Sequence, residues 1–243
     1  MIKKIKTLIK LFLKPFVPPI CKPSYIRELK NRIFHQEKII HRFEYEKNFY
    51  SRHAFINKAI MKFKDCSYLE IGVQDNNVFN SIPLKNDKKF GVDPERGGNY
   101  RMTSDEFFQK YNYLKFDVIF IDGLHEYEQC QRDCLNSIKS LKDGGIILFH
   151  DFLPRSPFEE NVPRKQTFWT GDVWKVAVEL ANSENADFRL VNIDMGIGIL
   201  KVNENFQYNK LNNIKNENFF NFLDYKKNLP IISSEEGLEF IIQ

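Results

Sequence analysis

Residues 116–129 have the sequence FDVIFIDGLHEYEQ, and this stretch decides the fold. Phe116–Ile121 is a short apolar run of the kind that forms a strand buried on both faces of a sheet. The polar residues Asp122 and His125 follow it at once, and the pattern from Glu126 to Lys142 predicts a helix. A buried strand that leads through a polar loop into a helix is the repeating unit of a parallel α/β sheet.

The same pattern recurs on both sides of this stretch. Further strands are expected at Tyr68–Val73, Lys89–Asp93, Asn99–Thr103 and Gly145–His150, and helices after Ser104 and over Asp172–Asn182. Two further strands are expected at Phe188–Ile193 and Gly196–Val202. Since only Asp194 and Met195 join them, they must form an antiparallel hairpin. The sequence therefore predicts an α/β fold with a mostly parallel sheet, a C-terminal antiparallel hairpin, and helices on both faces.

The charge of the 243-residue chain is divided unevenly. Residues 1–64 hold 16 Lys+Arg and 4 Asp+Glu, whereas residues 65–243 hold 20 and 28. We divide the chain accordingly into a basic amphipathic segment (1–23), a helical extension (24–64), a catalytic domain (65–202, with a lid at 152–171) and a tail (203–243). Cys130 and Cys134, four residues apart, could ligate a metal, but no second cysteine pair or histidine pair at ligand spacing completes such a site. Reduced thiols of a cytoplasmic protein are therefore favoured.

The first 20 residues carry five lysines and no acid, with apolar residues at helical spacing. Two interpretations remain open: a helix that lies on the inner, anionic face of a membrane, or a helix that packs on the body or on a second subunit of a homo-oligomer. No apolar run is long enough to span a membrane. Helices are expected from Ser24 to about Phe49 and over Arg52–Lys62. Nucleic-acid binding is not expected, because no recognisable module surrounds the basic residues.

Polar residues gather after the strands, where open α/β sheets bind ligands. Asp93, at the end of a strand, can accept hydrogen bonds from the hydroxyls of a ribose. The first turn contains Glu70, the single Gly72 and Asp75, and so lacks the glycine fingerprint of a nicotinamide-dependent oxidoreductase. An acid in this turn repels phosphate, which favours a cationic ligand that carries a ribose, such as S-adenosylmethionine.

These motifs resemble those of class I S-adenosylmethionine-dependent methyltransferases, and in particular the macrolide-sugar and surface-polysaccharide O-methyltransferase branch. The likeness covers about residues 50–202. It is carried by Tyr68–Val73, Gly91–Pro94, Met102–Phe108, Phe116–Gln129, Gly144–Asp151 and Gly171–Lys175.

The resemblance implies a Rossmann-like methyltransferase sheet and a role for each matching residue. Glu70, Gly72 and Asp93 would hold the methionine and ribose parts of the cofactor, and Thr103, Ser104 and Asp105 would lie beside the adenine. Asp122 and Asp151 would ligate Mg2+, and His125 would be the general base, so that Asp122 and His125 are the catalytic pair. The implied reaction is methyl transfer to a sugar hydroxyl in the biosynthesis of a surface glycan.

Two departures leave alternatives open. Asn76 or Asn77 stands where relatives often have a glycine, and His150 stands where metal-binding relatives often have a second acid. Both departures are compatible with a non-catalytic adaptor that keeps the fold and serves a membrane-associated glycan-assembly complex. Trp169, in the lid, is open to stacking on a sugar or to surface packing, whereas Trp174 is expected in the core.

Overall fold

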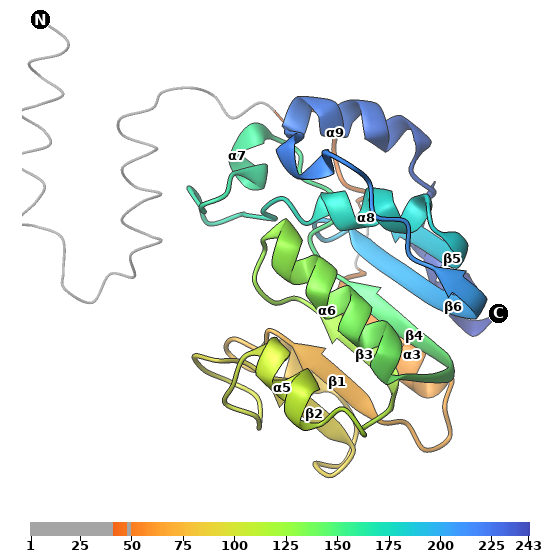
Figure 1. Cartoon of the computed structure of the whole chain (residues 1–243). Coiled ribbons are helices and arrows are strands. Elements are labelled where there is room, and N and C mark those ends of the chain that lie inside the picture. The colour runs from red at the N-terminus through yellow and green to blue at the C-terminus, as the bar shows by residue number, and fades with distance from the viewer. Residues whose placement is uncertain (1–40, 48–49) are drawn as a thin grey trace, which may run out of the picture.

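The computed structural model describes residues 41–47 and 50–243, and a seven-stranded sheet runs through it (Figure 1). The strand order is β2-β1-β3-β4-β6-β5-β7. The strands are β1 (Tyr68–Ile71), β2 (Lys89–Val92), β3 (Phe116–Ile121), β4 (Leu141–Phe149), β5 (Glu184–Val191), β6 (Ile197–Gln207) and β7 (Ile231–Ile232). Strands β1 to β4 pair in parallel, while β6 lies antiparallel between β4 and β5. The predicted mostly parallel sheet with a C-terminal antiparallel hairpin is confirmed.

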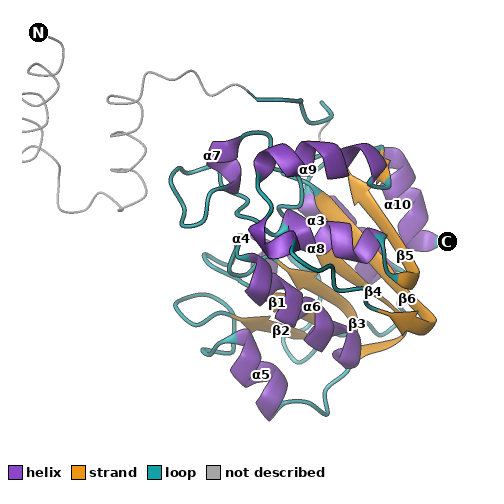
Figure 2. Ribbon diagram, turned by 45° about the horizontal axis from the view of Figure 1, so that its top comes forward, coloured by secondary structure: helices purple, strands orange, loops and turns teal. Residues whose placement is uncertain are grey.

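Helices cover both faces of the sheet (Figure 2). The helices are α3 (Arg52–Met61), α4 (Asn77–Ser81), α5 (Ser104–Lys110), α6 (Tyr127–Ser140), α7 (Pro157–Glu160), α8 (Trp174–Ala181), α9 (Phe219–Tyr225) and α10 (Ser234–Ile242). α5, α6, α8 and α9 lie on one face, and α3 and α10 pack against each other on the opposite face. Each face buries its own apolar cluster, and Trp174 is fully buried in the first one, as predicted.

The strand expected at Asn99–Thr103 is not formed. Only an isolated bridge joins Val92 to Tyr100, because the chain turns back through Gly97 and Gly98, both at positive φ. Strand β6 also continues past the expected domain boundary at residue 202, to Gln207.

The strap, as we name residues 41–47, contains no helix. The expected helix from Ser24 therefore does not reach Phe49, and the remainder of it, like the basic segment 1–23, lies outside the described residues. Main-chain hydrogen bonds hold the strap instead, from Arg42 N to Arg155 O (2.9 Å) and from Glu46 N to Asn192 O (2.8 Å). α3, predicted over Arg52–Lys62, is confirmed.

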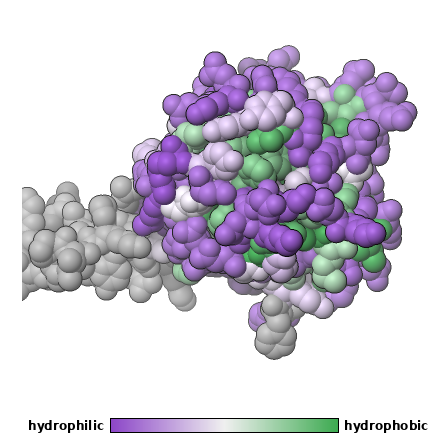
Figure 3. All heavy atoms as spheres, turned by 90° about the horizontal axis from the view of Figure 1, so that it is seen from below, coloured by the Kyte–Doolittle hydropathy of each residue, from purple (hydrophilic) through white to green (hydrophobic). Residues whose placement is uncertain are grey.

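The tail folds back onto the sheet. The sequence of the tail predicts a helix at Asn218–Lys227, and α9 forms there, while β7 and α10 had no clear sequence pattern. The hydroxyl of Ser234 donates to Glu46 of the strap (3.0 Å), which joins the tail to the start of the described chain. The surface seen in Figure 3 is mostly hydrophilic, with smaller hydrophobic areas. Within residues 41–47 and 50–243, no helix is long and apolar enough to cross a membrane.

Candidate active site

The loop after β3 places Asp122 and His125 at the carboxyl end of the sheet. The loop lies directly against the first turn: a Cβ on Gly72, whose φ is +86°, would stand 2.2 Å from the carbonyl oxygen of Asp122. Only glycine tolerates both that approach and that backbone conformation. Gly72 thus joins the turn after β1 to the loop that carries Asp122.

His125 is fixed from two directions. Its Nδ1 lies 2.9 Å from the carbonyl oxygen of Trp169, and its ring stacks on the indole of Trp169 with centroids 4.9 Å apart. Gly171, at a φ of +63°, brings the lid so close that a Cβ there would stand 1.7 Å from the carbonyl oxygen of His125. The sequence left Trp169 open between sugar stacking and surface packing; in the structure its ring covers the imidazole.

His150 and Asp151 follow β4 and complete the cluster. His150 Nδ1 lies 3.1 Å from both Asp122 Oδ1 and Asp151 Oδ2, and His125 Nδ1 lies 3.1 Å from the same Asp151 oxygen. Asp151 is 2% exposed and has a φ of +67°, and its Oδ1 has no hydrogen-bond partner. A buried carboxylate oxygen without a partner is costly and calls for an explanation by function.

Arg52 and Asp194 belong to the same cluster, although sequence analysis did not select them. Arg52, the first residue of α3, donates from Nη1 to Asp122 Oδ2 (2.9 Å). Its Nε and Nη2 donate to Asp194 Oδ2 and Oδ1, both at 3.0 Å. Asp194 lies in the turn between β5 and β6, so segments 142 residues apart in sequence meet in one bidentate pair. A charged residue at a helix start carries no motif, which is why this pair was not predicted.

The charges in this cluster are strongly coupled. Burial by itself lowers the pKa of His150, but the Asp151 and Asp122 carboxylates outweigh it and hold that pKa well above its usual value. The pKa of His125 is raised in the same way, against burial, by Asp151 and Asp122. Burial raises the pKa of Asp122, yet His150, His125 and Arg52 together hold it well below its usual value. The carboxylates and the cationic side chains therefore stabilise one another's charged forms.

Glu70 lies inside β1 and is almost fully buried. It accepts a hydrogen bond from the hydroxyl of Tyr68 (2.7 Å). Burial raises the pKa of Glu70 to about 8, with only partial compensation from Tyr68. A carboxyl group in this state is ready to ionise when a cation binds next to it.

Asp93 closes the loop after β2 through its carboxylate. Oδ2 accepts from Gln74 N (2.9 Å), and Oδ1 accepts from Glu95 N (2.9 Å) and Arg96 N (2.8 Å). Two carboxylate oxygens offer about four lone pairs. Asp93 therefore keeps capacity for about one further hydrogen bond, fewer than the two ribose hydroxyls expected from the sequence.

The Asn-for-Gly departure in the first turn is explained by the backbone. Asn76 has a φ of +65°, in the left-handed region where asparagine is the most tolerated residue after glycine. Its Oδ1 accepts from Gly98 N (2.8 Å) and so ties the first turn to the loop after β2. The substitution keeps the turn and adds a contact.

Thr103, Ser104 and Asp105 form the start of α5. Thr103 forms a capping box with Glu106, Ser104 Oγ accepts from Gln129 Nε2 (3.1 Å), and Asp105 pairs with Arg132 of α6 (3.3 Å). These contacts join α5 to α6. The role of the three residues beside an adenine stays a prediction.

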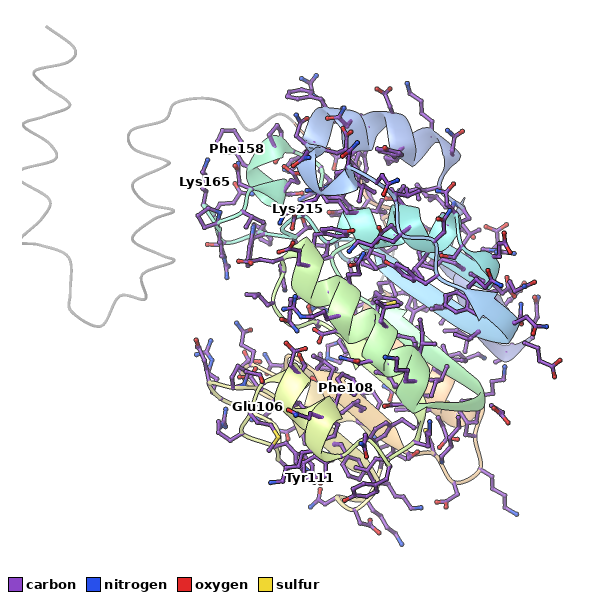
Figure 4. The ribbon with its side chains drawn as sticks, viewed as in Figure 1. Glu106, Phe108, Tyr111, Phe158, Lys165 and Lys215 are labelled. Carbon is purple, nitrogen blue, oxygen red and sulfur yellow. The ribbon has the colours of Figure 1, made fainter. Side chains whose placement is uncertain are left out.

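The lid (residues 152–171) contains one short helix, α7, where no element was expected. Figure 4 shows Phe158 and Lys165 in this segment, at the end of the molecule from which α6 starts. Glu159, fully buried, anchors the lid: its side chain accepts from Arg155 Nη2 (2.8 Å), and its carbonyl accepts from the amides of Thr170 and Gly171. Phe168 remains 64% exposed beside Trp169.

The structure thus brings together Asp122, His125 and Asp151, whose donor atoms lie within 4.8 Å of one another, a spacing compatible with a bound metal ion. Glu70, Gly72 and Asp93 lie at the ends of the neighbouring strands β1 and β2.

Part of the chain is similar to a known family. Residues 58–152, fewer than half of the chain, match the family model of a methyltransferase domain. No curated protein matches the sequence. Among solved structures, the chain is similar to MycE from the mycinamycin biosynthetic pathway, in complex with Mg, SAH and mycinamycin VI, at 14% identity and a TM-score of 0.38. That match covers 57% of this chain and only 45% of MycE.

Two further likenesses cover more of both proteins. An O-methyltransferase from Bacillus cereus in complex with SAH has 12% identity and a TM-score of 0.46, over 79% of this chain and 96% of that one. The O-methyltransferase TomG from Streptomyces achromogenes, in complex with SAM, has 10% identity and a TM-score of 0.45, over 80% and 95%. Residues 58–152 thus match a methyltransferase domain, and they lie in a sheet with the mostly parallel, Rossmann-like topology predicted from the sequence.

Proposed function

We propose that the protein transfers a methyl group from S-adenosylmethionine to a sugar hydroxyl, in a surface glycan or its nucleotide-linked precursor. The observation that carries the proposal is the placement of His125. Its imidazole is held between two carboxylates at the carboxyl end of the sheet, next to the turn that methyltransferase domains use for their cofactor. The sugar and glycan parts rest on the resemblance of the sequence motifs.

The contacts of His125 determine which of its nitrogens can act as a base. A carbonyl oxygen can only accept, so Nδ1 must donate its hydrogen to Trp169 O. When the ring has lost its second proton, the lone pair is therefore on Nε2, which lies 3.5 Å from Asp122 Oδ1. An acceptor hydroxyl bound beside Asp122 would give its proton to Nε2 as the methyl group leaves the sulfonium of S-adenosylmethionine.

The residues present also fit a divalent cation. The unpartnered Oδ1 of Asp151 is a buried acceptor that a cation would satisfy, and Asp122, His125 and Asp151 each offer a ligand atom within 4.8 Å of the other two. We propose that Asp122 and Asp151 hold the ion, Mg2+ in the first instance, which would lower the pKa of the acceptor hydroxyl. The nearby imidazoles are nitrogen donors, which suit Mn2+ or another transition ion better than Mg2+.

The cofactor would be held by the first two strands. Glu70 would pair with the ammonium of the methionine part, Gly72 would allow close approach of the main chain, and Asp93 would accept from the ribose. Thr103, Ser104 and Asp105 would border the adenine. Phe168, exposed in the lid, offers an aromatic face on which a sugar ring can stack.

We further propose that residues 1–20 bring the enzyme to an anionic membrane surface. The proposal is supported by the lysines and the apolar spacing of the sequence. Sedimentation of the full chain and of a chain lacking residues 1–20 with anionic vesicles tests it. Equal binding of the two chains to the vesicles would contradict the proposal. The remaining interpretation would then be a helix that packs on the body or on a second subunit.

One observation favours the second candidate, a non-catalytic adaptor. The carboxylate of Asp93 is already taken up by three main-chain amides, as in a loop built for structure. The adaptor would bind neither S-adenosylmethionine nor its product.

The experiment that tests the proposed function is transfer of a labelled methyl group from S-adenosylmethionine to a panel of nucleotide-linked and free hexosides. We expect label in at least one sugar, and loss of transfer in the His125→Gln protein. Treatment with EDTA, followed by restoration with Mg2+ or Mn2+, tests the cation separately. Methyl transfer that is insensitive to EDTA would contradict the proposed divalent cation, but not the role of His125 as the base.

A further inference from the structure

Arg52 lies outside the matched methyltransferase domain, yet it reaches the candidate site. The match begins at residue 58, whereas Arg52 starts α3 on the face of the sheet opposite α6 (Figure 2). Asp122 belongs to the loop that leads into α6. The ion pair of Arg52 with Asp122 therefore joins segments from opposite faces of the sheet at its carboxyl end.

Three groups determine the orientation of the guanidinium. Asp194 accepts from Nε and Nη2 in a bidentate pair, and the same carboxylate accepts from the main-chain N–H of Arg52 at the start of α3 (2.9 Å). A carboxylate at a helix N-terminus is favoured by the helix dipole, and a bidentate pair fixes the plane of the guanidinium. Nη1 is left to point at Asp122 (2.9 Å), and it also lies 3.2 Å from His150 Nδ1.

The consequence falls on Asp122. Arg52 takes up Oδ2, so Oδ1 is the oxygen turned toward His150 Nδ1 (3.1 Å) and His125 Nε2 (3.5 Å). Asp122 has no main-chain donor to its side chain among the contacts described, so these side chains alone hold its carboxylate. Without Arg52, the carboxylate could rotate about its χ angles.

The strap gives the start of α3 a fixed place. Glu46 N donates to Asn192 O, two residues before Asp194, and Tyr45 donates from its hydroxyl to Leu153 O (2.7 Å) in the lid. The segment that precedes α3 is thereby fastened to the same turn that holds the Arg52 side chain.

We propose that Arg52 is a positioning residue of this site: held by Asp194, it fixes the carboxylate of Asp122 and, through it, the ring of His125, while it contacts the ring of His150 directly. The effect on catalysis rests on the proposed function, whereas the effect on the site's geometry does not. No contact of Arg52 with substrate or cofactor is needed.

The test compares Arg52→Gln, Arg52→Lys, Asp194→Asn and the double variant Arg52→Gln/Asp194→Asn. Arg189→Gln is the matched control, because it removes another Arg–Asp pair (3.1 Å to Asp187) on β5, away from the site. The rings are followed by 1H–15N spectra of protein labelled on histidine, and assigned with the His125→Gln and His150→Gln proteins. His53, one residue after Arg52 on α3, reports whether the helix itself has moved.

We expect Arg52→Gln to shift the ring signals of His125 and His150 and to leave those of His53 in place. Asp194→Asn should shift the His125 signals in the same direction but less, and at His125 the double variant should add nothing to Arg52→Gln. His125 decides this comparison, because Asp194 Oδ1 itself lies 3.5 Å from His150 Nε2. Arg52→Lys should not restore the wild-type signals, because an ammonium has the charge but lacks the planar fork. Arg189→Gln should change neither ring.

Unchanged His125 and His150 signals in Arg52→Gln would overturn the proposal. So would full restoration by lysine, since charge alone would then suffice, or loss of the His53 signal, since α3 would then have undocked. If the wild-type protein transfers methyl groups, kcat in Arg52→Gln should fall by roughly ten- to a hundredfold with KM for S-adenosylmethionine unchanged. If the wild-type protein binds no S-adenosylhomocysteine, the proposed function fails while the ring spectra still decide the role of Arg52.

Discussion

Two buried acidic clusters of this molecule are built on opposite principles. Glu179 of α8 is fully buried, and its carboxyl group accepts from four neutral donors: Tyr127 Oη (2.9 Å), Gln131 Nε2 (2.7 Å), Tyr208 Oη (2.5 Å) and Leu211 N (2.9 Å). The cluster around Asp122 and Asp151 is held by cations instead, and it keeps an oxygen without a partner.

The kind of donor around each cluster distinguishes a structural role from a catalytic one. The donors to Glu179 come from α6, from the end of β6 and from the tail, and every one is satisfied, so this acid joins elements and has no capacity left for a ligand. In the site, the pKa of Asp122 is held well below its usual value, and Asp151 has an acceptor oxygen without a partner; both are features of a functional site. A buried acid alone therefore does not indicate chemistry; the kind of donor around it does.

The largest expected effect comes from replacing His125. In His125→Gln, the amide can still donate to Trp169 O, but the base is lost. We expect methyl transfer to fall by roughly 100- to 10,000-fold, with a Tm close to that of the wild-type protein. Kinetics with labelled S-adenosylmethionine and thermal unfolding measure the two quantities. Transfer within a few-fold of wild type would show that His125 is not the base.

Replacing Glu179 should produce the opposite pattern. In Glu179→Gln, the amide nitrogen faces donors that need an acceptor, so buried hydroxyl and amide groups lose partners. We expect the free energy of unfolding to fall by roughly 2–4 kcal/mol. The effect is measured by denaturant unfolding. The specific activity of the folded fraction should remain at the wild-type level. A loss of activity without a loss of stability would contradict the structural role assigned to Glu179.

Cofactor affinity should depend on pH through Glu70. The pKa of Glu70 is raised to about 8, and a carboxylate is needed to pair with an ammonium. Below pH 8, binding must displace a proton, so affinity for S-adenosylhomocysteine should rise by up to about tenfold per pH unit between pH 6 and 8 and then level off. Calorimetry across this range tests it. The Glu70→Gln protein should bind weakly with no such slope, and an identical slope in both proteins would exclude Glu70.

The smallest effect tests a single donor of the Glu179 cluster. Tyr208→Phe removes one of four hydrogen bonds and leaves the ring in place. We expect a loss of about 1 kcal/mol in the free energy of unfolding, and no change in methyl transfer. Denaturant unfolding again gives the value, and a loss as large as that of Glu179→Gln would mean that the tyrosine ring, and not the acid, organises this cluster.

Much of the fold was accessible from the sequence, because the strands are short apolar runs with polar residues directly after them. The juxtaposition of Asp122, His125 and Asp151 followed from the same pattern, since parallel strands end at one edge of the sheet. The hairpin followed from the few residues between its strands.

The residues that were missed depend on tertiary contacts. Arg52 and Asp194 stand far apart in sequence, at a helix start and in a turn, and neither position has a motif. Trp169 lies in the lid, whose sequence contains no recognisable motif, so its stacking on His125 could not be predicted. β7 has two residues, too few for any periodicity, and its place in the sheet depends on pairing with β5.

Calorimetric titration of the full-length protein with S-adenosylhomocysteine at pH 8 tests the central claim most directly. We expect one binding site with micromolar or tighter affinity, retained in His125→Gln and in Glu179→Gln. No heat of binding in the wild-type protein, with the fold intact by circular dichroism, would contradict the enzyme proposed here and favour the adaptor.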